Sequence, residues 1–273
     1  MTDLGDSPLG HATTYGDAYD ARLLFPVDRR PLRDALGLAD PPPFHGVDRW
    51  NAYELSWLDA TGKPQIAIAS FDVPAESPRI VESKSVKLYL TAFNLTRFAG
   101  HDQVAATIAR DIGAATGAAV GVTLVAPERF GTLSIGEPRG DCLDALPAAF
   151  DAFTPEPDAL ASSGEPAAET LFTRLFRSVC PVTGQPDYAT IEIAYRGPRI
   201  DRAGLLRYLV SFRRHAGFHE HCAERIFTDV WQRCRPQRLA VCARFMRRGG
   251  VDINPYRTSG DEPPDFGSRD ARQ

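Results

Sequence analysis

A cysteine in the second half of the chain has the surroundings expected of a nucleophile. Cys180 lies in the segment SVCPVTGQPD, before a proline and a turn rather than within a periodic apolar run. A thiol is an intrinsically strong nucleophile, even though only a small fraction of it is ionised at neutral pH. Asp187 ends the same segment, and His219 and Glu220 follow in FHEHC. An acid and a histidine beside a thiol are the groups that covalent catalysis with proton transfer requires.

A cluster of charged and hydroxyl groups stands in the first half, in the segment ESKSVKLYL. Its members are Glu82, Ser83, Lys84, Ser85 and Lys87, so it holds two of the three lysines of the chain. The cluster is either the solvated first turn of a helix, with an acid at the favourable end of the helix dipole, or part of a binding site. Arg247-Arg248-Gly249-Gly250 is open to the same two interpretations, because paired arginines beside glycines suit a phosphate.

The candidate nucleophile and its neighbours also have structural interpretations. Asp187 stands at a strand entrance, where an acid often caps its own turn. His219, His221 and Cys222 raise the possibility of a zinc site, but histidines two residues apart point to different helix faces, and no standard zinc motif occurs. The sequence therefore predicts no metal site. The remaining cysteines fit buried, unreactive thiols; they are Cys142, Cys222, Cys234 and Cys242.

The elements that must position these residues occur twice, because residues 58–125 recur in residues 180–246. Thr183-Gly184 stands 122 residues after Thr61-Gly62, and Asp229 stands 118 residues after Asp111. In each half, alternating strands precede two stretches of helical spacing, and alternating strands return. The expected helices are 86–94 and one around 104–112, then 205–213 and one around 222–230. We expect an α+β fold with antiparallel sheets and helices on one face.

The two halves differ at the positions that carry chemistry. With a separation of 122 residues, Cys180 matches Leu58 and Asp187 matches Gln65; with 120, His219-Glu220 matches Ala99-Gly100. By the same count, Glu82–Ser85 matches 202–205, which lack the acid and lysine. Neither half is complete by itself. We therefore expect a composite site that takes Glu82 and lysines from the first half and the thiol group from the second.

Composition bounds the class of protein. A chain of 273 residues predicts about two domains, and 43 % hydrophobic with 24 % charged residues is typical of a globular protein. A net charge of −4 gives no basic field for nucleic acid. No apolar run long enough for a membrane span and no signal-peptide pattern occur, so we expect a cytoplasmic protein without a membrane partner.

Changes in composition along the chain suggest where its parts begin and end. We expect a first module over residues 1–135 and an exposed connector rich in Pro, Ala, Asp and Glu over 136–168. A second module over 169–257 is followed by a disordered tail at 258–273.

The same motifs resemble those of the NADPH-dependent 7-cyano-7-deazaguanine reductases, the nitrile reductases of queuosine biosynthesis, in their long two-module form. The resemblance runs from about residue 9 to residue 257. It rests on GVDRWNAYELSWL, ESKSVKLYL, CPVTGQPDYA, FHEHC and RRGGVDINPYR. It implies two tandem tunnelling-fold modules, a homodimer, and NADPH as cosubstrate without a metal.

The resemblance also implies a role for each candidate residue. Cys180 would add to the nitrile carbon and form a thioimide, Asp187 would protonate the nitrile nitrogen, and His219 would orient the nicotinamide or assist proton transfer. Glu82, Ser83 and Glu220 would bind the guanine-like substrate edge, with the carboxylates accepting its N–H groups. The NADPH contacts would come from Lys84, Ser85, Lys87, His219, Arg247, Arg248 and Gly249.

Two other functions compete with this one. A zinc-dependent cyclohydrolase of the GTP type shares the tunnelling fold and also uses Cys and His, and it predicts stoichiometric zinc. A non-catalytic purine- or tRNA-binding module needs no Cys180 beside Asp187, and the acidic composition weighs against tRNA. The sequence favours the reductase.

Overall fold

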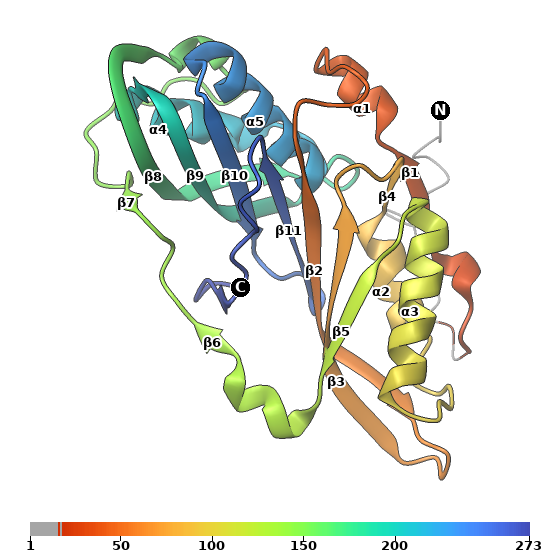
Figure 1. Ribbon diagram of the computed structural model, residues 1–273. Coiled ribbons are helices and arrows are strands. Elements are labelled where there is room, and N and C mark those ends of the chain that lie inside the picture. The colour runs from red at the N-terminus through yellow and green to blue at the C-terminus, as the bar shows by residue number, and fades with distance from the viewer. Residues whose placement is uncertain (1–15, 17) are drawn as a thin grey trace. The chain divides into compact units, whose positions relative to one another are not determined.

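The computed structural model describes residue 16 and residues 18–273, which form two compact units. Unit 1 comprises the described residues up to 35 together with 47–133 and 247–253; unit 2 comprises 36–46, 134–246 and 254–273. Each unit combines antiparallel strands with two main helices (Figure 1). Within the described residues no helix is both long and apolar enough to cross a membrane.

Unit 1 is built around three long or medium strands. β3 (Pro64–Pro74) lies between β2 (His45–Leu58) and β5 (Gly121–Val125) and is antiparallel to both. The main helices are α2 (Ser83–Thr91) and α3 (His101–Thr116). The smaller elements are η2 (Ala21–Leu23), β1 (Pro26–Asp28), α1 (Arg30–Ala35), β4 (Arg79–Val81) and η3 (Pro127–Thr132).

Unit 2 repeats this plan with longer strands. β9 (Pro186–Ile200) pairs antiparallel with β8 (Ser162–Val179) and β10 (Arg238–Phe245), and β10 pairs antiparallel with β11 (Val251–Thr258). Its main helices are α4 (Arg202–Val210) and α5 (His219–Cys234). The smaller elements are β6 (Ser134–Ile135), β7 (Asp141–Cys142), η4 (Pro157–Ala159), η5 (Ser211–Arg214) and β12 (Ser268–Arg269). Here too the fold is α+β, as expected.

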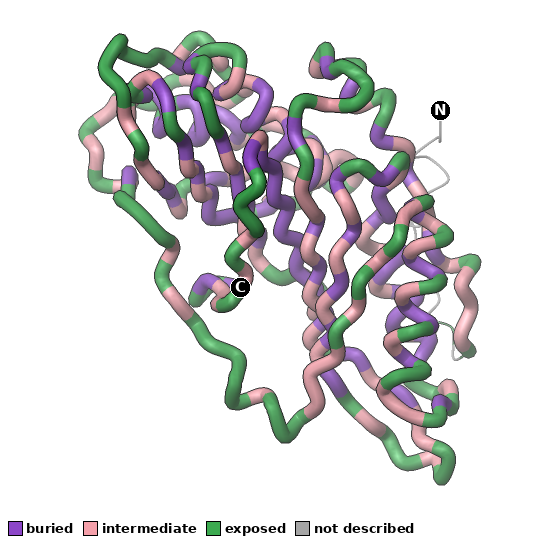
Figure 2. The backbone as a smooth tube through the Cα atoms, in the orientation of Figure 1, coloured by how far each residue is buried: buried purple, intermediate pink, exposed green. Residues whose placement is uncertain are grey.

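Helical spacing in the sequence produces the cores. On α3, Val104, Ile108 and Ile112 recur every four residues, and all three are fully buried. On α5, Ile226 and Val230 are buried in the same way against unit 2. Each such side chain contributes about 1.5–3 kcal/mol by leaving water. Figure 2 shows the result, with buried residues along one side of α3 and exposed residues along the other.

The duplication is visible in equivalent hydrogen bonds. The Tyr89 hydroxyl donates to Asp111 at 2.7 Å in unit 1, and the Tyr208 hydroxyl donates to Asp229 at 2.6 Å in unit 2. Each pair ties the first main helix of its unit to the second. The match of Asp111 with Asp229 that the sequence indicated is therefore correct.

The register of the repeat differs from expectation at the helix starts. α2 and α4 each have nine residues and α3 and α5 each have sixteen, so Ser83 matches Arg202 and His101 matches His219. It follows that Glu82 matches Asp201. The expected matches of Glu82 with Arg202 and of His219 with Ala99 were wrong by one and two residues, because the connecting loops of the two halves differ in length.

The segment between the modules is less exposed than its composition suggested. β8 already begins at Ser162, and Leu143 and Leu160 are buried in the core of unit 2. The connector also holds β7 and η4. A few apolar residues within an otherwise polar segment pack into the core, and the average composition of the segment does not reveal them.

The C-terminal segment is ordered by specific buried contacts, contrary to the expectation for 258–273. The Thr190 hydroxyl donates to Asp270 at 2.7 Å, and the Gln273 amide donates to the Phe245 carbonyl at 3.1 Å. β12 also pairs in parallel with β6. The polar composition of this segment does not reveal that the side chains of Asp270 and Gln273 form hydrogen bonds with buried partners.

Candidate active site

Cys180 is held at the end of β8 by the turn that follows it. Its N–H donates to the Gln185 carbonyl at 2.9 Å, and the Gly184 N–H donates to the Cys180 carbonyl at 3.0 Å. Gly184 has a φ of +66°, a backbone conformation that favours glycine. The thiol-bearing residue is buried, with 7 % of its surface exposed. The Thr-Gly-Gln-Pro turn thus fixes the backbone of the candidate nucleophile.

The loop before α5 is tied to the same strand end. The Val179 N–H donates to the His215 carbonyl at 2.9 Å, and the Gly217 N–H donates to the Val179 carbonyl at 3.2 Å. A Cβ on Gly217 would lie 3.0 Å from the His215 ring and 3.5 Å from the Cys222 sulfur, so glycine gives these two side chains room at the loop. These bonds bring the FHEHC motif beside the residue that precedes Cys180.

Asp187 and His219 meet in unit 2. Asp187 is the second residue of β9, and one of its carboxylate oxygens lies 3.5 Å from His219 Nε2. His219 begins α5, and its ring stacks on Phe245 with centroids 3.8 Å apart and planes 4° from parallel. Among the described residues, its buried Nδ1 has no hydrogen-bond partner. The imidazole is therefore held in one plane by the Phe245 ring, with Nε2 facing Asp187.

Glu220 and Cys222 lie close to this acid–histidine pair. Glu220 is buried in the first turn of α5. Burial raises the pKa of Cys222 to about 12, and the negative charges of Asp187 and Glu220 add to the rise. The structure therefore brings Asp187, His219 and Glu220 close together, with Cys180 in the turn that leads into β9. The thiol of Cys222 stays neutral beside them.

One neighbour of the site was missed at the level of sequence, and the environment of one cysteine elsewhere in unit 2 was wrongly expected. Phe245 was counted only as a core position of an alternating strand, and its contact with His219 depends on the β9–β10 register that pairs it with Ala189. Cys142 was expected to be a buried thiol and is exposed. Its position in the two-residue strand β7, at the edge of unit 2, explains the difference.

In unit 1, Glu82 caps α2. Its two carboxylate oxygens accept the N–H groups of Lys84 at 2.6 Å and of Ser85 at 2.9 Å. Glutamate is not among the preferred capping residues, and this one is fully buried. Asp201 caps α4 in the same way, with half of its side chain exposed. An acidic side chain thus caps the first main helix in both halves, but only in the first half, at Glu82, is this side chain buried.

The two serines of the cluster differ in what they can offer a ligand. Ser83 is partly exposed at the first helical position. Ser85 is fully buried; its hydroxyl donates to the Glu82 carbonyl at 2.6 Å and accepts the Phe25 N–H at 3.0 Å. Because Ser85 is engaged within the protein, we leave it out of the proposed NADPH contacts.

Among the residues expected to contact NADPH, Lys87 and Gly249 of unit 1 lie against each other. A Cβ on Gly249 would lie 3.3 Å from Lys87 Cδ, so Lys87 packs against the glycine turn, and both line a cavity of about 70 Å³. Arg247 lies with its guanidinium 4.5 Å from the Tyr53 ring centroid. Ammonium and guanidinium groups can donate hydrogen bonds to the phosphates of a dinucleotide, and glycines beside them leave space for the phosphates to approach. The residues of this part therefore fit NADPH.

The first half retains a counterpart of the thiol site. Asp59 follows β2 as Cys180 follows β8, and Gln65 follows the first residue of β3 as Asp187 follows that of β9. The expected match of Cys180 with Leu58 was therefore wrong by one residue, whereas the match of Asp187 with Gln65 is correct. The Gln65 amide donates to Asp59 at 3.0 Å. His101 matches His219 and packs edge-on against Trp57. Histidine is thus present in both halves, and the thiol and its acid are particular to the second.

Comparisons with known proteins decide the family. Residues 15–124 match a family model described as "Nitrile reductase, 7-cyano-7-deazaguanine-reductase N-term", and residues 186–264 match one described as "QueF-like protein". The chain is 55 % identical over 269 residues to the NADPH-dependent 7-cyano-7-deazaguanine reductase of Burkholderia ambifaria (strain MC40-6), covering 98 % of each chain. The chain belongs to the family of NADPH-dependent 7-cyano-7-deazaguanine reductases.

Membership in this reductase family makes the chain an oxidoreductase of tandem tunnelling-fold modules, with NADPH as the family's cosubstrate. The reductase of Paraburkholderia xenovorans (strain LB400) is 54 % identical over 98 % of both chains. A structure of an apo archaeosine synthase QueF-Like matches 36 % of this chain and 99 % of its own at 25 % identity, with a TM-score of 0.33. The zinc-dependent cyclohydrolase and the non-catalytic module are set aside in favour of the reductase.

Proposed function

We propose that this chain reduces the nitrile of 7-cyano-7-deazaguanine to the aminomethyl group through a covalent intermediate on Cys180, in queuosine biosynthesis. The observation that carries the proposal is the placement of Cys180 at the end of the β8–β9 hairpin whose next strand presents Asp187 to His219 at 3.5 Å. A nucleophile, an acid and a histidine then act within one short segment of structure.

The first step joins substrate and enzyme without a change of oxidation state. The Cys180 sulfur attacks the nitrile carbon and forms a C–S bond, while one C–N π bond breaks and the nitrogen takes a proton. Asp187 gives the nitrogen this proton, and the proton that leaves the Cys180 thiol restores the Asp187 carboxyl group, so the product is a neutral thioimide and no net proton is consumed. Burial of the thiol excludes water, which would otherwise compete for the activated carbon.

The following steps consume four electrons in two additions. NADPH, when bound, supplies a hydride for each addition. Between the two additions the C–S bond breaks, Cys180 leaves as a thiolate, and a free imine remains for the second reduction. Asp187 and His219 donate protons to the substrate nitrogen after each hydride addition, so that the product leaves as an amine with all its hydrogens.

Recognition of the substrate and of NADPH is proposed for the remaining candidates. Glu82, with Ser83, and Glu220 accept hydrogen bonds from the adjacent N–H groups of the deazaguanine ring, which a carboxylate matches in geometry. Lys84, Lys87, Arg247, Arg248 and the Gly249 turn hold the phosphates of NADPH. His219 orients the nicotinamide through the plane that Phe245 imposes on its ring.

Assembly and location belong to the same proposal. We infer a homodimer in the cytoplasm that binds small molecules and no nucleic acid directly. The acidic net charge of −4 supports the last point. Light scattering of the purified chain should give twice the mass of 29.9 kDa.

The deciding experiment separates covalent attachment from turnover. Without NADPH, intact-protein mass spectrometry of wild type with the nitrile should show one substrate added per chain, and Cys180→Ala should show none. With NADPH and excess chelator, wild type should consume two NADPH per nitrile. Cys142→Ala removes an exposed thiol instead and serves as the control. Turnover by Cys180→Ala at the wild-type rate would exclude the covalent route.

A further inference from the structure

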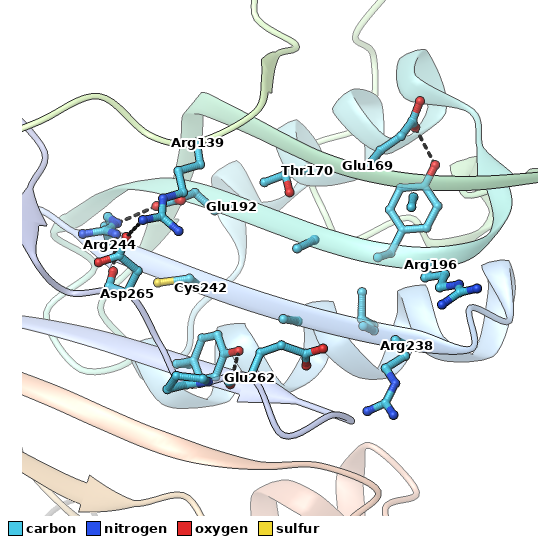
Figure 3. A pocket seen from close by; sticks show the side chains of 17 residues that line it. Arg139, Glu169, Thr170, Glu192, Arg196, Arg238, Cys242, Arg244, Glu262 and Asp265 are labelled. Carbon is cyan, nitrogen blue, oxygen red and sulfur yellow. Dashed lines mark hydrogen bonds and ion pairs between the residues drawn. The ribbon is translucent and has the colours of Figure 1, made fainter.

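A cavity of about 510 Å³ lies on unit 2, and none of the residues proposed for the reaction lines it. Its lining includes Ala240 and Cys242 of β10, which alternate with Val241 and Ala243 of the core. Because successive side chains of a strand point to opposite faces, the cavity lies on the face that α4 and α5 leave uncovered. Figure 3 shows it from close by.

The floor of this cavity is made of small side chains. Ala168, Ala194 and Ala240 stand on three neighbouring strands, and Ala194 and Ala240 are directly opposite each other. Residues of this size leave a flat surface on which a planar ring can lie. The volume falls in the range of about 300–1,000 Å³ that small-molecule sites have.

One end of the cavity is electrically balanced. Arg244 pairs with Glu192 and donates to the Asp265 carbonyl at 2.7 Å. Arg139 pairs with the Asp265 carboxylate. These residues gather at the same end in Figure 3, and their opposite charges leave no excess there.

The other end carries an excess of positive charge. Arg196 and Arg238 are directly opposite each other in the β9–β10 ladder, and both line the cavity. Within the part of the chain that the structure describes, neither guanidinium makes a hydrogen bond or an ion pair. Like charges directly opposite across a strand pair are destabilising. Two carboxylates, Glu169 and Glu262, also line the cavity. Glu169 is already paired with Arg199 and Arg202 outside the lining, so Glu262 alone is left to face the two arginines.

We propose that this cavity binds a small ligand of the nucleoside monophosphate class, with its ring on the alanine floor and its phosphate between Arg196 and Arg238. A guanidinium presents donors in a fork that matches phosphate oxygens, and two of them match a dianion. The ligand relieves the repulsion between the arginines. The site is distinct from the one proposed for NADPH, because none of its lining residues is among those proposed to contact NADPH.

Calorimetric titration with GMP and with inorganic phosphate tests this site, in the presence of saturating NADP⁺ to occupy the dinucleotide site. Wild type should bind one GMP per chain under these conditions. Arg196→Gln/Arg238→Gln should weaken both probes about tenfold or more, as expected for lost hydrogen bonds to a charged group. Ala194→Phe fills the floor, so it should weaken GMP and leave phosphate binding unchanged.

The matched control removes the same charge elsewhere. Arg207→Gln/Arg235→Gln replaces two arginines outside the cavity lining and should leave the affinity for GMP unchanged. Equal weakening in the control would overturn the proposal, as would failure of wild type to bind either probe. A change of molecular mass in Arg196→Gln/Arg238→Gln with GMP binding intact would also overturn it, because the arginines would then serve a contact between chains.

Discussion

Asp59 and Cys180 occupy the same backbone position in the two halves of the chain. Each follows the last residue of a long strand, and each N–H donates across a Thr-Gly turn, to Lys63 at 3.0 Å and to Gln185 at 2.9 Å. The Asp59 carboxylate is engaged by Thr61, Lys63 and Gln65, which together hold its pKa below the ordinary value. The same local fold thus carries a structural acid in one half and a candidate nucleophile in the other.

This equivalence predicts different results for two Asp→Asn substitutions. Asp187→Asn keeps the size of the side chain and removes the proposed proton donor, so kcat should fall by about 10²–10⁴-fold. Asp59→Asn, at the turn of the other half, should leave kcat nearly unchanged. Steady-state NADPH oxidation measures both. Equal losses in the two variants would show that the effect of Asp187 is not chemical.

Glu82 and Asp201 provide a second matched pair, because both cap a helix. Glu82→Gln and Asp201→Asn should each lower the free energy of unfolding by up to about 1 kcal/mol, which urea titration can measure. Only Glu82→Gln should also raise the KM for the nitrile, by about tenfold or more, since it loses charged hydrogen bonds to the substrate. An unchanged KM would leave Glu82 with capping as its sole role.

The cysteines should differ sharply toward iodoacetamide at pH 8. Burial raises the pKa of Cys222 and Cys242 to about 12 and that of Cys234 to about 11. A thiol with a pKa near 12 is about one part in ten thousand thiolate at this pH. Peptide mass spectrometry should find the exposed Cys142 modified and these three unmodified until urea is added. Prior addition of the nitrile should protect Cys180, and rapid labelling of Cys222 in the folded chain would contradict its burial.

His215 should make the fold sensitive to mild acid. Burial, with the nearby charges of Arg225 and His221, lowers its pKa from 6.5 to about 4. The unfolded chain then binds a proton that the folded chain does not, so the free energy of unfolding falls as the pH decreases from about 6.5 toward 4. Urea unfolding at several pH values should show a shallower fall in His215→Asn than in wild type. His45→Asn, at an exposed position, should keep the wild-type slope.

The sequence by itself determined the features that depend on local periodicity and on rare motifs. Ile108 and Ile112 follow Val104 at helical spacing, and burial of that face produces the helix where it was expected. The duplication followed from the Thr-Gly turns of both halves and from the match of Asp111 with Asp229. The motifs around Cys180 and Glu82 pointed to the reductase family, which the 55 % identity to a curated relative establishes.

Only the tertiary structure decided which distant groups meet. The match of Glu82 with Asp201 required the true start of each helix, since loops of different length shift the repeat by a residue. The stack of Phe245 on His219 depends on strand register, and the ordered C-terminus depends on partners such as Thr190 for Asp270. The closeness of Arg196 and Arg238, which are 42 residues apart in sequence, likewise appears only when β9 and β10 pair. Periodicity records which face of an element is buried, but not the partner that covers it, because that partner is chosen by contacts between segments far apart along the chain.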